Sequence, residues 1–357
     1  MLDAYMKNLA LKLLLDLLRA YSPTYEEEKA IKVLEEYSIK LGFDSVTVDS
    51  AGNLIAEAGS GDKTIALIGH VDTVTGQLPV TFDGGIVTGR GAVDAKGPLA
   101  AMFIASAKAA SILGGDSFRV KAVAAVGEEG PSHGAWALVN GGFKADYIIV
   151  GEPTNVSNVA IGCRGSCRLI VECKSSGGHT ANPELYESAC VKLIEAWGLV
   201  SSRVNSLYTA AITRMACGEA MSNVVPRGGS MTVLIRIPVE SSVSELMRVL
   251  EDILPASGCS WRIEGCIEPY KTSPSNPVAR SLVRAIVVSG LKPRITVKMG
   301  TSDMNILSKI TGNIAENGPG KPELSHTDHE SINVNDYFKG IEVYVRSIME
   351  LSGKNMR

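Results

Sequence analysis

Several acidic and histidine side chains directly follow short apolar runs, where they could bind a divalent metal ion. Three such runs lead into His70 and Asp72, into Glu128 and Glu129, and into Glu152. A further acidic residue, Asp94, lies in the glycine-rich segment 89–97. If the runs are parallel strands, their carboxyl ends share one edge of a sheet, where sites usually form. We therefore expect these six residues to converge.

A cluster of carboxylates at one sheet edge requires something to neutralise it, because like charges at close range repel strongly. Imidazole and carboxylate ligands without a thiolate favour zinc, cobalt or manganese over a closed structural zinc site. The number of carboxylates predicts two ions about 3.5–4 Å apart that share one bridging carboxylate and a water. Any one of these acidic residues alone would be read as a helix cap or a turn residue. The adjacent pair Glu128 and Glu129, after a buried strand, is the most specific feature.

The elements that must position these residues alternate between strands and helices in the first part of the chain. We expect strands at 45–48, 53–58, 64–68, 120–126 and 147–150, and helices at 9–20, 26–41 and 98–113. Ser22 and Thr24 precede the second helix and are expected to cap it. Alternation of this kind is typical of an α/β fold with a largely parallel sheet.

The pattern changes after about Val159. The next elements are expected to be a strand at 166–174, a helix at 183–204, strands at 208–217 and 229–237, a helix at 242–254 and a strand at 260–267. This order is that of the ferredoxin-like split βαβ arrangement. Helices at 277–289, 303–309 and 334–351 and a strand at 294–297 then resume the first pattern. The prediction is a mostly parallel-sheet α/β catalytic domain with helices on both faces (1–159 and 270–357), interrupted by an inserted α+β domain (160–269).

Composition excludes several classes of protein. The 357 residues carry a net charge of -3, and no basic patch of the kind that binds nucleic acid is present. No apolar stretch is long enough to span a membrane, and charged residues interrupt the leucines of segment 9–20, so we expect a cytoplasmic protein without a signal peptide. The seven cysteines do not predict a disulfide framework. We considered a zinc site at Cys163, Cys167 and Cys173, but we favour buried, apolar roles for them.

The motifs together resemble those of the M20-like di-zinc amidohydrolases and peptidases, which include acetylornithine deacetylase, succinyl-diaminopimelate desuccinylase and related carboxypeptidases. The matching segments are His70-x-Asp72, Gly91-x-x-Asp94-x-Lys-Gly97, Glu128-Glu129, Gly151-Glu152-Pro153 and His326. The resemblance implies two divalent ions, with zinc expected and cobalt as an alternative. It also implies these roles: His70 and Glu152 bind one ion, Glu129 and His326 bind the other, Asp94 bridges them, Asp72 orients His70, and Glu128 is the general base. We choose His326 over His329 because its spacing to Glu330 matches the family pattern.

The resemblance extends to the inserted domain, which in this family acts in lid closure and dimerisation. Segment 178–183 resembles the lid motif, in which His179 would stabilise the oxyanion from its own subunit or from the partner subunit of a homodimer. Asn223, Arg236, Gly300 and Thr301 correspond to residues that bind the substrate and its carboxylate. From the residues alone, His179 could be a turn histidine, Arg236 a solvated strand residue, and segment 300–303 a helix cap.

The length of the chain and segment 318–330 most resemble the branch of the family that releases lysine or ornithine from LysW, a small acidic carrier protein. This implies a role in lysine or arginine biosynthesis, with lysine and ornithine as alternatives. An N-acyl amino acid deacylase and a metal-dependent dipeptidase or carboxypeptidase are the rival enzymes. A non-catalytic, metal-dependent binding protein is a further alternative, but it would not need a general base such as Glu128.

Overall fold

The computed structural model describes residues 2–114, 118–204 and 208–354, which form two compact units. The main unit contains the residues up to Ile161, Thr272–Val297 and the residues from Ser302 onwards. The inserted unit contains Gly162–Lys271 and Lys298–Thr301. No helix within the described ranges is long and apolar enough to cross a membrane.

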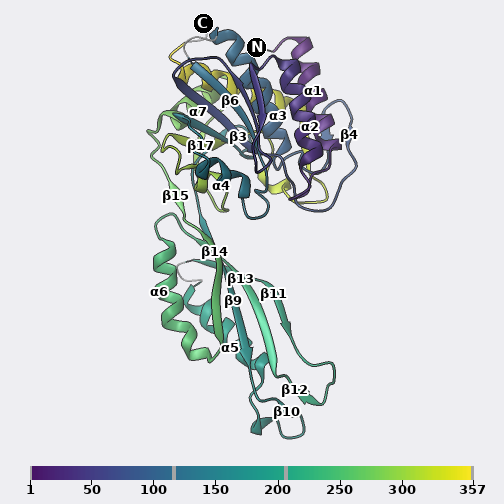
Figure 1. Cartoon of the computed structure of the whole chain (residues 1–357), viewed down its shortest axis with the longest axis vertical. Helices are drawn as coiled ribbons and strands as arrows, with labels where there is room; N and C mark the ends of the chain where they lie inside the picture. The colour runs from purple at the N-terminus through teal and green to yellow at the C-terminus, as the bar shows by residue number, and fades with distance from the viewer. Residues whose placement is uncertain (1, 115–117, 205–207, 355–357) are drawn as a thin grey trace. The chain divides into compact units, whose positions relative to one another are not determined.

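The main unit is built on a twisted sheet with a parallel centre (Figure 1). In spatial order its strands are β1 (Ser45–Val48), β2 (Leu54–Ala58), β6 (Phe118–Ala125), β3 (Lys63–His70), β7 (Tyr147–Gly151), β17 (Ile314–Asn317) and β8 (Asn158–Cys163). A further strand, β16 (Arg294–Lys298), pairs with β8. Strands β6, β3, β7 and β17 are parallel to one another, whereas β1, β2 and β8 pair antiparallel with their neighbours. The predicted mostly parallel α/β sheet is confirmed.

Helices cover this sheet and fix its hydrophobic core. They are α1 (Ala4–Arg19), α2 (Glu28–Leu41), α3 (Lys96–Leu113), α4 (His133–Asn140), α7 (Pro277–Val288), α8 (Asp303–Leu307) and α9 (Val334–Leu351). Helix α3 packs on β3, β6 and α9, while α4 packs on α8. Every residue of β3 after Lys63 is buried, as expected for a strand that is covered on both faces. A small sheet of β18 (Ser331–Asn333), β5 (Ile86–Thr88) and β4 (Thr81–Phe82) and a 3-10 turn at Pro322–Leu324 complete the main unit.

The inserted unit has the predicted ferredoxin-like order of strands and helices (Figure 1). Its elements are β9 (Gly165–Lys174), α5 (Ala189–Val204), β11 (Thr209–Cys217), β13 (Gly228–Ile237), α6 (Val243–Ile253) and β14 (Ser260–Ile267). They form an antiparallel sheet in the order β11-β13-β9-β14 with a hydrophobic core of its own.

Several short elements of the inserted unit were not predicted. They are the strand pair β10 (Gly178–His179) and β12 (Val224–Val225), the strand β15 (Tyr270–Lys271) against the end of β8, and the 3-10 turn Leu254–Ser257. The expected helix at 183–204 is in fact a 3-10 turn, Pro183–Leu185, followed by α5 from Ala189.

The expectation that the cysteines form no disulfide framework is wrong. Six of the seven cysteines are paired within the inserted unit, as Cys167–Cys266, Cys173–Cys259 and Cys190–Cys217, whereas Cys163 is buried and forms no disulfide. The partners lie 99, 86 and 27 residues apart in the sequence, so local spacing could not reveal them. Two of the pairs join β9 to β14 or to the residue just before it, where the antiparallel register brings the Cα atoms to 4.2 and 4.5 Å.

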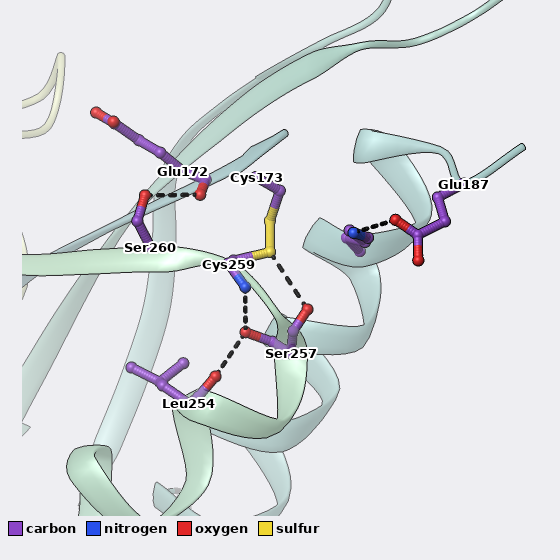
Figure 2. The surroundings of a disulfide bond; sticks show 8 residues. Glu172, Cys173, Glu187, Leu254, Ser257, Cys259 and Ser260 are labelled. Carbon is purple, nitrogen blue, oxygen red and sulfur yellow. Dashed lines mark hydrogen bonds and ion pairs between the residues drawn. A yellow bond between two sulfur atoms is a disulfide. The ribbon is translucent and has the colours of Figure 1, made fainter. Parts of the chain in front are cut away.

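Figure 2 shows how the turn before β14 presents one of these cysteines. The Ser257 hydroxyl donates to the Leu254 carbonyl at 2.7 Å and accepts the Cys259 amide at 3.2 Å. On the next residue, the Ser260 hydroxyl donates to the Glu172 carbonyl at 3.1 Å, next to Cys173 in β9. The disulfide therefore closes a contact that hydrogen bonds already hold in register.

We predict that the oxidised, denatured protein exposes a single reactive thiol per chain, that of Cys163, and that reduction raises the count to seven.

We also predict that Cys173→Ser/Cys259→Ser lowers the unfolding free energy of the inserted unit by about 2–5 kcal/mol, because the unfolded chain gains conformational entropy. In a Trp136→Phe background, fluorescence of Trp197 and Trp261 would report this unit alone. Seven reactive thiols before reduction would show that the disulfides do not form.

Candidate metal centre

The register of the parallel strands places the predicted site residues at one sheet edge. His70 is the last residue of β3 and lies opposite Ala125, the last residue of β6. Ile68 of β3 pairs with Val150 of β7, so Glu152, two residues on, follows β7 at the level of His70. The expected convergence at the carboxyl ends of the strands is thus a consequence of register.

Asp72 is the hub of this edge. Its fully buried carboxylate accepts the Glu128 amide on Oδ1 at 3.0 Å and the Glu129 amide on Oδ2 at 3.1 Å. The Thr24 hydroxyl also donates to Oδ2, at 2.8 Å. Gly127 has a φ of 77°, and a side chain there would overlap the ring of His133, so the turn into Glu128 requires glycine.

His70 is held so that one ring nitrogen faces the other predicted ligands. Its Nδ1 lies 3.0 Å from the Asp72 carbonyl oxygen, a bond that the protonated nitrogen would donate. The Nε2 atom then faces Asp94 Oδ1 at 3.2 Å and Glu152 Oε1 at 3.9 Å. Fixing Nδ1 in this way leaves Nε2 available as a metal ligand.

Asp94 lies between two groups of potential ligands. Its Oδ1 faces His70, whereas its Oδ2 lies 3.3 Å from Nε2 of His326, which in turn lies 2.8 Å from Oε1 of Glu129. Two sets of three residues each offer ligand atoms that lie within 4.8 Å of one another: His70–Asp94–Glu152 and Asp94–Glu129–His326. His70, Glu128 and Glu129 form a third such set. The donors are imidazole nitrogens and carboxylate oxygens, which suit zinc-class divalent ions.

The alternative histidine, His329, does not join these sets in the described part of the chain. It is exposed, and its backbone amide donates to the Thr327 hydroxyl at 3.3 Å. The side chain of His326 is half exposed but contacts two of the predicted ligands, Asp94 and Glu129.

Without a cation, these groups strongly perturb one another. Burial raises the pKa of Glu128 well above its usual range, and the charges of Glu152, Asp303 and Glu129 add to this effect against that of His70. Burial alone would lower the pKa of His70, but its interactions with Asp72 and Asp94 raise it well above 6.5. Hydrogen bonds to Asp94 and Glu129 raise the pKa of His326 to about 10. The raised pKa values of these three groups are the expected result of gathering carboxylates and imidazoles in a buried site.

The remaining predicted site residues lie in the inserted unit, as two pairs. His179 is in β10, opposite Val224 of β12, and the Thr180 amide donates to the Asn223 carbonyl at 3.2 Å. Arg236 Nη1 donates to the Thr301 hydroxyl at 2.8 Å, next to Gly300. Segment 300–303 also caps a helix, because the Ser302 hydroxyl accepts the Met304 amide at the start of α8.

Two residues near the centre were not predicted as part of it. Thr24 was expected to cap α2, but its hydroxyl binds Asp72, and α2 begins at Glu28 without a side-chain cap. Asp303 is buried beside Ser132, and burial raises its pKa to about 7. No local spacing signals the contact of Thr24, whereas the placement of Asp303 after Gly300-Thr301-Ser302 was the one available indication.

Comparison with known proteins identifies relatives along almost the whole chain. The profile of peptidase family M20/M25/M40 matches residues 66–350. A [LysW]-lysine/[LysW]-ornithine hydrolase of Saccharolobus solfataricus is 35% identical over 97% of this chain and 96% of its own length. A protein of Aeropyrum pernix, to which the same activity is assigned provisionally, is 44% identical over 97% of both chains. The family predicted from the motifs is confirmed.

Solved structures share the fold at lower identity. The aminopeptidase PepT of Bacillus cereus superposes with a TM-score of 0.80 at 22% identity, covering 98% of this chain and 99% of its own. An M20 family metallo-carboxypeptidase of Sulfolobus solfataricus gives a TM-score of 0.80 at 16% identity, with 98% and 100% covered.

We predict that metal binding releases protons and strengthens as the pH rises from 6 to 8. A metal ion binds the neutral imidazole, whereas the neighbouring carboxylates raise the pKa of His70 and raise that of His326 to about 10, so the metal must compete with protons for these rings. Calorimetric titration of the metal-free protein with Zn²⁺ in buffers of different ionisation enthalpy would count the protons. Metal affinity that is independent of pH would contradict this assignment of ligands.

Proposed function

The chain belongs to peptidase family M20/M25/M40, and from that premise we propose that it hydrolyses the amide bond that joins lysine or ornithine to the carrier protein LysW. A metal-dependent amide hydrolase is what the family and its relatives establish. The substrate rests on one observation: relatives named for this activity align along nearly the whole length of both chains.

We propose that the two sets sharing Asp94 each hold one divalent ion, zinc or alternatively cobalt. His70 and Glu152 would complete one set, and Glu129 and His326 the other. When bound, such ions lower the pKa of a water molecule and polarise the scissile carbonyl. Asp94 would bridge them, since each of its two oxygens already faces a different histidine.

Glu128 is proposed as the general base, with Asp72 as the residue that orients its neighbours. Glu128 is only partly buried, and its amide is fixed by Asp72, the residue whose carbonyl also fixes the ring of His70. Burial and neighbouring carboxylates raise its pKa, which favours a side chain that accepts a proton and later delivers it to the leaving amine. Nearby cations would moderate this rise.

The inserted unit would supply the groups that recognise the substrate. Arg236 can bind the free carboxylate of the amino acid, for which a planar guanidinium is well suited, with Thr301 and Gly300 beside it. His179 would stabilise the oxyanion. Asn223 is the residue just before β12, and its carbonyl accepts the amide of Thr180, the residue after His179. We propose a homodimer, in which His179 acts in its own or in the partner's site.

Replacing Glu128 with Gln should lower kcat by a factor of about 10²–10⁴, because the amide cannot accept the proton from water. Metal content should stay unchanged, since Glu128 belongs to neither set that shares Asp94. Elemental analysis and turnover would be measured on the same preparation. Full turnover by Glu128→Gln would contradict the role of general base.

The substrate is tested by release of free amino acid from LysW-linked lysine, LysW-linked ornithine, N-acetylornithine and a dipeptide, at equal concentration and with metal-loaded protein. We expect release from the carrier-linked amino acids to have the highest kcat/KM. Faster release from N-acetylornithine or from the dipeptide would keep the metal chemistry but make the protein a deacylase or a peptidase. Glu128→Gln is the matched control for a contaminating hydrolase.

A further inference from the structure

Two of the proposed ligands, Asp94 and His326, lie on irregular loops rather than at the end of a strand. Asp94 is in the loop between β5 and α3, and His326 lies in the segment between the 3-10 turn Pro322–Leu324 and β18. His326 also has a φ of 64°, a conformation that few residues other than glycine adopt. Something other than a strand ladder must therefore hold these two side chains next to each other.

A single carboxylate, that of Glu330, organises the first of these loops. Glu330 is fully buried, and its Oε1 accepts the backbone amides of Gly91, Val93 and Asp94, each at 3.0 Å. The Gly89 amide donates to the backbone oxygen of Glu330 at 3.2 Å. The backbone of the proposed bridging ligand is thus fixed by a residue four positions after His326.

Arg90 links the same carboxylate to the loop of His326. Its Nη1 donates to Glu330 Oε2 at 2.9 Å and to the carbonyl of Thr327, the residue after His326, at 3.0 Å. Its Nε donates to the Gly76 carbonyl at 2.9 Å. Arg90 is 5% exposed, so the pair with Glu330 is shielded from solvent. The more distant contact with Asp328, at 3.9 Å, involves a side chain that is largely exposed and adds little.

A buried carboxylate is destabilising unless it is paired and hydrogen-bonded, and here the donors come from the residues that need to be positioned. Gly91 fits this arrangement because it has a φ of 88°, and a side chain would contact Lys96 and Thr73 at 2.9 Å. The loop can therefore close around Oε1 without obstruction. Loss of the charge on Glu330 would loosen both loops at once.

We propose that Glu330, together with Arg90, is a positioning residue of the metal centre, which sets Asp94 and His326 at the separation that the Asp94–Glu129–His326 set requires. This inference rests on the proposed metal centre but assigns a role to residues that are not ligands. It also gives a physical reason for the conformation of His326, since the chain must turn sharply to return to Arg90 and Glu330.

The test is Glu330→Gln, which keeps the size of the side chain but removes its charge and places an amide N–H₂ group among N–H donors. We expect the affinity for the second equivalent of Co²⁺ to fall by about 10–100-fold, as is usual when the partners of metal ligands are changed. Visible absorption of bound Co²⁺ and metal content after dialysis would measure it. The remaining spectrum should match that of His326→Ala, and excess metal should restore turnover.

Glu342→Gln is the matched control. Glu342 is a partly buried carboxylate in α9 that binds Arg346 at 2.9 Å and Lys339 at 3.2 Å, outside the ligand sets. The Glu342→Gln variant should have a lower free energy of unfolding but an unchanged affinity for Co²⁺. If Glu330→Gln does the same, Glu330 supports the fold alone and the inference is overturned.

Should Glu330→Gln fail to fold, Arg90→Lys decides the matter. Lysine keeps the charge beside Glu330 but cannot reach the carbonyls of Gly76 and Thr327 together. We expect the same selective loss of the second Co²⁺ equivalent to a smaller extent, and unchanged affinity would overturn the inference. A wild-type protein that binds fewer than two ions would instead refute the proposed centre itself.

Discussion

The repulsion among carboxylates at one edge of the main sheet is the constraint on which the rest of this protein depends. Asp94, Glu128, Glu129 and Glu152 lie within reach of His70, and burial keeps water from screening their charges. Burial and the neighbouring carboxylates raise the pKa of Glu128, and the carboxylates also raise the pKa values of His70 and His326. Two divalent ions would neutralise these carboxylates and turn a destabilising cluster into a Lewis-acid site.

Different parts of the surrounding structure hold different residues of this cluster in place. The register of the parallel strands places the backbone of His70 and Glu152 at the same level, and the Asp72 carbonyl orients the ring of His70. The Glu128–Glu129 turn is fixed through its backbone amides by Asp72. Asp94 and His326 have no such strand, and the buried carboxylate of Glu330 provides the link between their loops. Two buried carboxylates that are not proposed as ligands, those of Asp72 and Glu330, therefore shape the centre through backbone N–H groups.

The inserted unit is smaller than the main unit and has a hydrophobic core of its own. Its three disulfides restrict the unfolded chain: two join β9 to β14 or to the residue just before it, and the third joins α5 to the end of β11. Such bridges are rare inside mesophilic cells, but they are a known feature of intracellular proteins of hyperthermophiles. The four-stranded sheet contains Arg236 in β13, and His179 lies in the separate two-stranded sheet of β10 and β12.

The sequence alone determined most of the alternation of strands and helices, although it missed α4, β8 and β17. It also determined the ferredoxin-like order of the insertion and the six acidic and histidine candidates, of which all but Asp94 lie at the ends of strands. These are local signals: apolar periodicity sets the elements, and parallel strands place the residues that follow them at one edge. Only the tertiary structure decided which oxygen of Asp94 faces which histidine, that Thr24 binds Asp72 rather than capping a helix, and how the cysteines pair. Each of these joins residues that are far apart in the chain, and such contacts depend on register and loop closure, which no local pattern encodes.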